Sequence, residues 1–180
     1  MAREELTRLT GNEWKAKIQG FKREAWRLET LPVYRVPSED GDIQDFLAGQ
    51  RIDPRDYSSG YTEGLRRIRE EGKCKGRVHI IRQPLTDYLR FEFMYYDAHS
   101  RAGDDIRILD VTDRPNPLEG VPDFWLFDRS EVVLMIYEAD GTQTGRDLYD
   151  GDPAPYIEYQ RIALAESVPF REYVNGGHRA

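Results

Sequence analysis

Alternating apolar and polar residues predict three extended strands in the first two thirds of the chain. Residues 24–29 alternate, which places Trp26 and Leu28 on one inner face. Residues 77–82 are rich in β-branched side chains, and residues 105–111 alternate again before a loop that contains three prolines. These patterns predict half-buried or buried strands.

The same signals predict an antiparallel meander further along the chain. Residues 124–127, 132–137 and 144–149 are apolar or alternating, and each is short enough for one strand. Residues 128–130 separate the first pair, and the Asp140-Gly141 turn signal separates the second pair. Short connections of this kind join neighbouring antiparallel strands.

Apolar residues at helical spacing predict four helices. Residues 4–20 form a first, loosely started helix, and we expect Ser38 to cap a short second helix that runs through Leu47. Residues 61–71 carry a narrow apolar stripe. The last helix is expected to open at Asp152-Pro153 and to end by Pro169.

Residues 86–101 fit two patterns. Leu89, Phe91, Phe93 and Tyr95 alternate with polar or mixed residues as a strand would. The stretch is nevertheless long, begins with a helix-capping threonine and contains no turn signal before Gly103. We therefore predict a helix.

Together the elements predict a single domain over residues 1–180. Its fold class is α/β (α+β), with one mixed, largely antiparallel central sheet, a C-terminal antiparallel meander and flanking helices. We expect an ordered core over about residues 20–170 and a frayed tail over 175–180, because the tail is polar and glycine-rich.

The composition limits the class of protein and the cellular compartment that we expect. The 180 residues are 39% hydrophobic and 33% charged, enough for a core and for solubility. There is no run of about 20 apolar residues and no signal-like N-terminus, and the lone Cys74 cannot form an internal disulfide. We therefore expect a cytoplasmic protein without membrane contact, with an inert loop thiol favoured over a reactive one.

Charge argues against direct nucleic-acid binding. The formal net charge is −7 and the isoelectric point is near 5.1, so the chain as a whole repels phosphate backbones. The local exception is a basic cluster over residues 66–77, interrupted by Glu70 and Glu71. A solvated helix face explains this cluster better than a nucleic-acid site does.

The familiar signatures of catalysis are missing. The three histidines, His79, His99 and His178, lack partners at zinc-site spacing, and only His99 is a candidate base. There is no glycine-rich phosphate loop and no nucleophile elbow. We predict no metal site, no cofactor and no assignable catalytic residue.

One group of polar residues is unusual enough to be a candidate ligand site. Within residues 87–92, helical spacing places Asp87 beside Arg90, and Tyr88 beside Glu92. An ion pair on a helix whose aromatic residues fill the core accounts for the same residues, and we weigh it above a pocket. The full candidate set for ligand binding is Asp87, Tyr88, Arg90, Glu92, Trp125 and Asp128.

Four segments carry a resemblance to a known family. The sequences Ala25–Glu29, Pro84–Glu92, Ala102–Arg107 and Asp123–Asp128 resemble a family of uncharacterised actinobacterial proteins, the domain-of-unknown-function family 6879. The likeness extends over most of residues 20–170. It implies a helix-turn-helix DNA-binding regulator as partner, because family members are often encoded beside such regulators, and it supplies no catalytic residues.

The order of elements is also similar to half of a phospholipase D-like domain. Active members of that superfamily carry a His-x-Lys-x4-Asp motif. If Asp128 stood at its Asp position, the His and Lys positions would hold Val121 and Asp123. The likeness therefore implies a degenerate, non-catalytic half-domain.

Two functions follow as expectations. The first is a non-enzymatic binding or regulatory module that acts with a helix-turn-helix regulator, and the surplus of tyrosines would also suit an interface between copies of the chain. The alternative is a small-molecule-binding enzyme or sensor with a pocket around Asp87, Tyr88, Arg90, Glu92 and Trp125.

Overall fold

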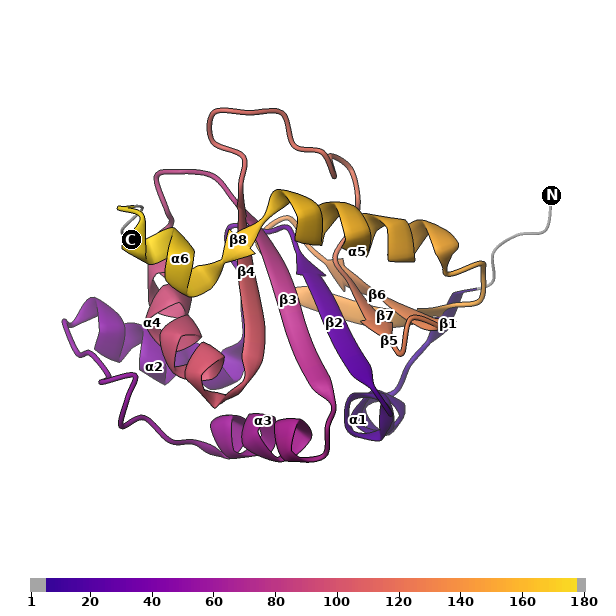
Figure 1. The fold of residues 1–180 in the computed structure, drawn as a ribbon, viewed down its shortest axis with the longest axis horizontal. Helices are drawn as coiled ribbons and strands as arrows, with labels where there is room; N and C mark the ends of the chain where they lie inside the picture. Colours follow the sequence, from indigo (N-terminus) through magenta and orange to yellow (C-terminus); the bar gives the residue numbers. More distant parts are fainter. Residues whose placement is uncertain (1–5, 178–180) are drawn as a thin grey trace.

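The protein is built around one mixed sheet, seen in a computed structural model that describes residues 6–177 (Figure 1). Across these residues eight strands follow the order β1-β7-β6-β5-β2-β3-β4-β8. They are β1 (Leu6–Arg8), β2 (Glu24–Glu29), β3 (Cys74–Ile81), β4 (Asp104–Asp110), β5 (Phe124–Phe127), β6 (Glu131–Tyr137), β7 (Gln143–Tyr149) and β8 (Val168–Pro169). β2, β3 and β4 run parallel, and every other neighbouring pair is antiparallel. The predicted α/β class, with a largely antiparallel sheet and a β5-β6-β7 meander, is confirmed.

Helices cover both faces of the sheet. Figure 1 shows α5 alongside the meander, and α4 and α6 toward β4. The helices are α1 (Gly11–Gly20), α2 (Asp40–Leu47), α3 (Gly60–Glu70), α4 (Asp87–Ala102), α5 (Ala154–Glu166) and α6 (Phe170–Asn175), with a 3-10 turn, η1 (Pro37–Glu39), before α2. The face under α5 is apolar and contains Trp26, Leu28, Phe124 and Leu126, with Ala163 from the helix itself.

The ambiguous segment is the helix α4, as predicted. Thr86 Oγ1 accepts a hydrogen bond from the Leu89 amide at 3.1 Å, and Gly103 ends the helix with φ +117°. The strand-like alternation arises because α4 is buried on more than one side. Phe91 packs against Phe46 of α2, while Phe93 packs against Phe170 of α6.

The start of the chain corrects one prediction. Leu6–Arg8 is the edge strand β1, paired antiparallel with β7, rather than the beginning of a helix. The helix begins only at Gly11, where Thr10 Oγ1 accepts from the Glu13 amide and the Glu13 carboxylate accepts from the Thr10 amide. The tertiary pairing with β7 overrides the local helical pattern.

Two further boundaries differ from the predictions. Ser38 is not a helix cap, because Pro37 opens η1 and α2 follows directly from Glu39. The strand predicted to start after Gly76 begins at Cys74. Gly76 therefore lies inside the strand. Glycine suits this position because β4 is so close that a Cβ would lie 3.0 Å from the Asp105 carbonyl oxygen.

The C-terminal region holds one more helix than predicted. α5 is followed by α6, in which Phe170 and Tyr173 are buried against the residues of α4 and β4. Burial of these two aromatic side chains offsets the entropy cost of ordering a six-residue helix that has little stability alone. The predicted frayed tail, 175–180, extends into residues outside the described part of the chain.

Candidate functional site

The sheet face opposite α5 carries charged residues at its centre. Arg27 on β2 is in register with Arg77 on β3 and with Trp125 on β5. Since side chains alternate along a strand, Arg27 and Glu29 point away from the apolar face that holds Trp26 and Leu28. Two guanidinium groups and a carboxylate therefore lie in the middle of the molecule.

Glu29 is the hub of this charge network. Its carboxylate, 3% exposed, lies 3.0 Å from an Arg27 nitrogen and 3.3 Å from an Arg77 nitrogen. Burial alone would raise the pKa of Glu29, but the two guanidinium groups outweigh it and lower the pKa to about 2. Arg77 also donates to Asp104 at 3.0 Å and to the Tyr61 hydroxyl at 2.8 Å. Both charges of Arg77 and Glu29 are thus well compensated.

Arg27 is held by aromatic rings as well as by Glu29. Its guanidinium lies 5.3 Å from the ring centre of Tyr34 and 5.8 Å from that of Trp125, and it donates to the Tyr137 hydroxyl at 2.9 Å. The Arg27 Nε–H is buried and has no partner. One donor of this residue is therefore left unsatisfied within the described part of the protein.

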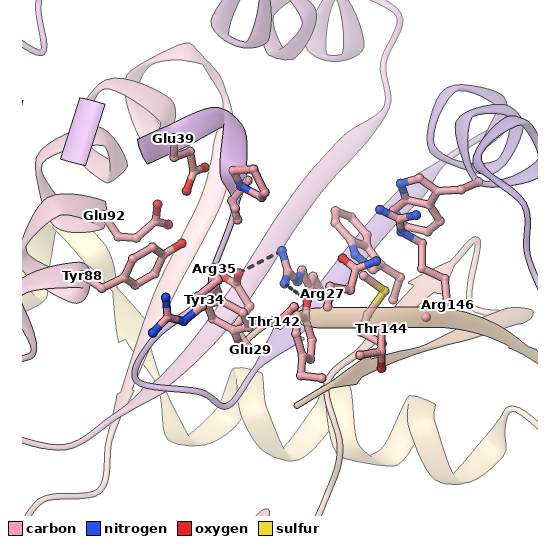
Figure 2. Close-up of a pocket in the computed structure, with 18 of the residues that line it drawn as sticks. Arg27, Glu29, Tyr34, Arg35, Glu39, Tyr88, Glu92, Thr142, Thr144 and Arg146 are labelled. Atoms are coloured by element: carbon pink, nitrogen blue, oxygen red, sulfur yellow. Dashed lines mark hydrogen bonds and ion pairs between the residues drawn. The ribbon is translucent and has the colours of Figure 1, made fainter. Parts of the chain in front are cut away.

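A cleft lies directly over this network (Figure 2). Its larger lobe has a volume of about 850 Å³ and is bounded by β2, β5, β7, η1, α4 and α1. A second lobe of about 420 Å³ extends toward α3 and the C-terminal part of α4. The lobes share six lining residues: Trp14, Arg27, Glu39, Arg77, Glu92 and Trp125.

One end of the cleft is acidic. Figure 2 shows the side chains of Glu39, Glu92 and Tyr88 converging from η1 and α4. In the described part of the chain neither carboxylate has a basic side chain within ion-pair distance. Burial, together with the charges of Glu29 and Glu39, raises the pKa of Glu92 to about 8, and burial with Glu29 raises the pKa of Glu39. Within the described residues neither carboxyl forms an ion pair, and Arg77 and Arg27 act on them only at longer range.

The opposite end of the larger lobe holds one cation, Arg146, and the second lobe holds another, Lys75. Arg146 of β7 lies with its guanidinium 5.1 Å from the ring centre of Trp14, and across residues 6–177 no carboxylate pairs with it. Lys75 lies over Tyr61 and Trp125, at 4.6 and 5.5 Å from their ring centres, on the wall of the second lobe. Burial lowers the pKa of Lys75 to about 8. Both cations contact aromatic rings instead of acids.

Several buried polar atoms around the cleft have no hydrogen-bond partner. They are Arg27 Nε, Trp125 Nε1, Glu39 Oε2 and His99 Nδ1. Trp125 is only 6% exposed and lines both lobes, so its indole N–H is removed from bulk water. Because buried polar groups are nearly always satisfied, atoms of this kind indicate a place where a ligand or ordered water completes the bonding.

The candidate residues from the sequence divide between the cleft and other places. Tyr88, Glu92 and Trp125 line it. Asp87 and Arg90 pair with each other at 3.2 Å on the exposed side of α4, outside the cleft, in agreement with the ion-pair interpretation. Ligand binding by any of these residues stays a prediction.

Asp128 lies in the β5–β6 turn, away from the cleft. It has φ +52°, and its carboxylate accepts the backbone N–H groups of Lys22, Arg23 and Glu24 at 2.7–3.2 Å. Burial disfavours its charged form, but these three hydrogen bonds outweigh that effect and lower its pKa. Asp128 therefore ties the end of α1 and the start of β2 to the meander.

Replacing Asp128 by alanine should destabilise the fold by about 1–3 kcal/mol, since it removes the acceptor for three amides. Urea unfolding at pH 7 measures this loss. Asp128→Asn keeps one carbonyl oxygen and should lose less. Equal stability of all three proteins would show that solvent replaces the carboxylate without cost.

The basic network under the cleft was missed at the sequence level. The sequence pattern does not single out Arg27 and Arg146, because single charged residues in strands are ordinarily surface residues. The available signal was Arg27 and Glu29 alternating with Trp26 and Leu28 in a strand at the centre of the sheet. Lys75 and Arg77 point into the cleft, so the basic cluster over 66–77 does not form one surface.

Other classes of site are scarce in the part of the chain that the structure describes. Across residues 6–177 no three His, Cys, Asp or Glu side chains are arranged to hold a metal ion. No described helix has the length and apolar character needed to cross a membrane. Cys74 is an exposed free thiol at the start of β3.

Comparison with known proteins places the chain in a family. A search of curated proteins gave no match. A family model described as a domain of unknown function (DUF6879) matches residues 12–175, which include every residue of the cleft except Arg8 and Leu9. The resemblance to this family is thereby confirmed, while the actinobacterial origin and the likeness to phospholipase D-like domains stay predictions. The chain belongs to the DUF6879 family.

Proposed function

We propose that this protein is a binding module for a small polar metabolite, which it holds in the cleft above Arg27 and Trp125. The observation that carries the proposal is the set of buried, unpartnered polar atoms on residues that line the two lobes of one cleft. The larger lobe, at about 850 Å³, falls within the usual range for ligand pockets, and it combines aromatic walls with a few polar groups.

Binding fits the residues better than catalysis does. His99, the candidate base, is packed against Tyr61 and Tyr95, and burial lowers its pKa to about 4. A base with that pKa is weak at neutral pH. His79 is fully buried between the Tyr96 hydroxyl and the Leu31 carbonyl, at 2.8 and 2.9 Å. The Tyr96 hydroxyl beside His79 belongs to a side chain that is itself fully buried.

A regulatory role is compatible with this proposal. The partnership with a helix-turn-helix regulator rests on the family resemblance alone and stays a prediction, as does the cytoplasmic location. A module that binds a metabolite could transmit its occupancy to such a partner. The cleft is therefore the feature to test first.

The test is retention of metabolites from a deproteinised extract of the native cells. Immobilised protein should retain one or a few small molecules, identified by mass spectrometry. Trp125→Phe removes the unpartnered indole N–H while keeping an aromatic ring, and Arg27→Met removes the central cation. Both variants should lose most of the retained material, provided that circular dichroism shows them folded.

Arg90→Met is the matched control, because Arg90 lies on the same helix as Glu92 but outside the cleft. It should retain the same molecules as the natural protein. If the natural protein retains nothing, or if folded Trp125→Phe and Arg27→Met both retain as much as it does, the cleft is not a ligand site.

A further inference from the structure

The charges of the cleft are segregated along its length. Glu29 and Asp104 together balance the charges of Arg27 and Arg77, so the middle of the floor has little unbalanced charge. Among the described residues of the larger lobe, the charged groups without an ion-pair partner lie at the two ends, with Glu39 and Glu92 at one and Arg146 at the other, whereas Lys75 lines only the second lobe. Figure 2 shows this arrangement, with Arg27 between the two ends.

The strand order indicates the length of the gap. Arg146 lies on β7, which is three strands from β2 and four from β3. Neighbouring strands are about 4.8 Å apart, so Arg146 and Arg27 belong to strands roughly 14 Å apart. The Arg146 side chain extends over Trp14 along the cleft, and Glu92 reaches in from α4. A ligand that contacts both ends must therefore be an extended molecule rather than a compact ion.

From this distribution, and on the basis of the proposed function, we propose that the ligand is a zwitterionic guanidino or amino acid. Its guanidinium or ammonium group binds Glu39 and Glu92, and its carboxylate binds Arg146. Arg27 and Trp125 line the cleft between the two ends and contact the middle of the ligand. In the empty cleft at pH 7 Glu92 is largely protonated, because its pKa is about 8, and it releases that proton when the ligand's cation binds. The ligand then supplies each end with a counter-charge.

Two other ligand classes fit less well. A metal ion would need more than these two carboxylates, and the described residues contain no three-ligand group. A polyanion would meet Glu39 and Glu92 without compensation, because the central guanidinium groups are committed to Glu29 and Asp104. Only a molecule with both charges satisfies both ends.

The experiment is calorimetric titration with three probes that differ by one charged group. L-arginine carries both groups, L-citrulline replaces the guanidinium by a neutral urea, and agmatine lacks the carboxylate. L-arginine should bind, and the other two should bind at least about tenfold more weakly, as expected for loss of a charge-assisted hydrogen bond.

Two variants, each of which removes one charge from the protein, test which end of the cleft binds which group of the ligand. Glu92→Gln should weaken L-arginine binding about tenfold or more and leave citrulline binding unchanged, because citrulline has no cation to lose. Arg146→Gln should weaken L-arginine binding and leave agmatine binding unchanged. Arg90→Met should leave all three affinities unchanged. Thermal unfolding checks that each variant is folded.

The outcomes separate the two proposals. Retention of a cellular metabolite without detectable binding of L-arginine at millimolar concentration would overturn the ligand class while supporting a binding cleft. Equal affinity for all three probes, or losses in Glu92→Gln that are as large for citrulline as for L-arginine, would also overturn it. Losses of affinity that are selective for the probe's cation in Glu92→Gln and for its carboxylate in Arg146→Gln would establish the orientation of bound L-arginine.

Discussion

Glu29→Gln should lower the free energy of unfolding at pH 7 by about 3–5 kcal/mol, the usual cost of removing one partner from a buried ion pair. The substitution preserves shape but leaves Arg27 and Arg77 buried beside each other without a shared anion. Urea denaturation measures the loss. Glu119→Gln is the control, because the Glu119 side chain is 78% exposed and its pairing with Arg82 spans 3.9 Å; it should change stability by less than about 0.5 kcal/mol.

The same carboxylate predicts a pH dependence with a definite sign. The pKa of Glu29 is about 2 in the folded protein, below its ordinary value of 4.5. The contribution of the Glu29 charge to the free energy of unfolding is therefore fully present above pH 4.5 and is lost as the pH falls through about 2. That contribution is on the order of 3 kcal/mol. The stability gap between the natural protein and Glu29→Gln should shrink over this interval, and a gap that is constant down to pH 2 would contradict the assignment.

Phe124→Ala should cost about 3–5 kcal/mol on the other face of the sheet. The ring is fully buried and lies between Trp26 of β2, at 5.6 Å, and Tyr156 of α5, at 4.9 Å between ring centres. Its removal leaves a cavity between the sheet and α5 that rigid neighbouring strands cannot close.

Thermal or urea unfolding measures the effect of Phe124→Ala, and amide exchange should show that α5 loses protection. Phe124→Leu keeps most of the volume and should cost less than about 2 kcal/mol. A loss for Phe124→Ala no greater than that for Phe124→Leu would mean that the site collapses, and that α5 does not depend on this contact.

Local patterns were enough to predict most elements, because local physics selects them. Alternation in residues 24–29 and the Asp140-Gly141 signal identify a strand and a turn from interactions within a few residues. Thr86 and Gly103 likewise mark the ends of α4 by capping. The errors occurred where distant pairing decides, as at Leu6–Arg8, which becomes a strand only because β7 is beside it.

The candidate site was predictable in part for the same reason. Tyr88, Glu92 and Trp125 were identified from their unusual chemistry, and the ion-pair interpretation of Asp87 and Arg90 also came from helical spacing. Spacing along α4 could not show which of its faces meets the cleft. Asp128 was conspicuous by residue type, yet its partners are amides more than 100 residues earlier in the chain.

The sequence by itself determined the fold class, most strand and helix positions and the absence of familiar catalytic motifs, since these depend on periodicity, capping and spacing within one segment. Only the tertiary structure decided that Arg27, Arg77 and Trp125 lie in one row across three strands, under residues from α1, η1, α4 and β7. Strand order and register bring these residues together, and burial then makes each charge dependent on a partner. A charged residue in a strand has an ordinary place at the surface, but at the centre of a covered sheet it must find a partner within the fold or in a ligand.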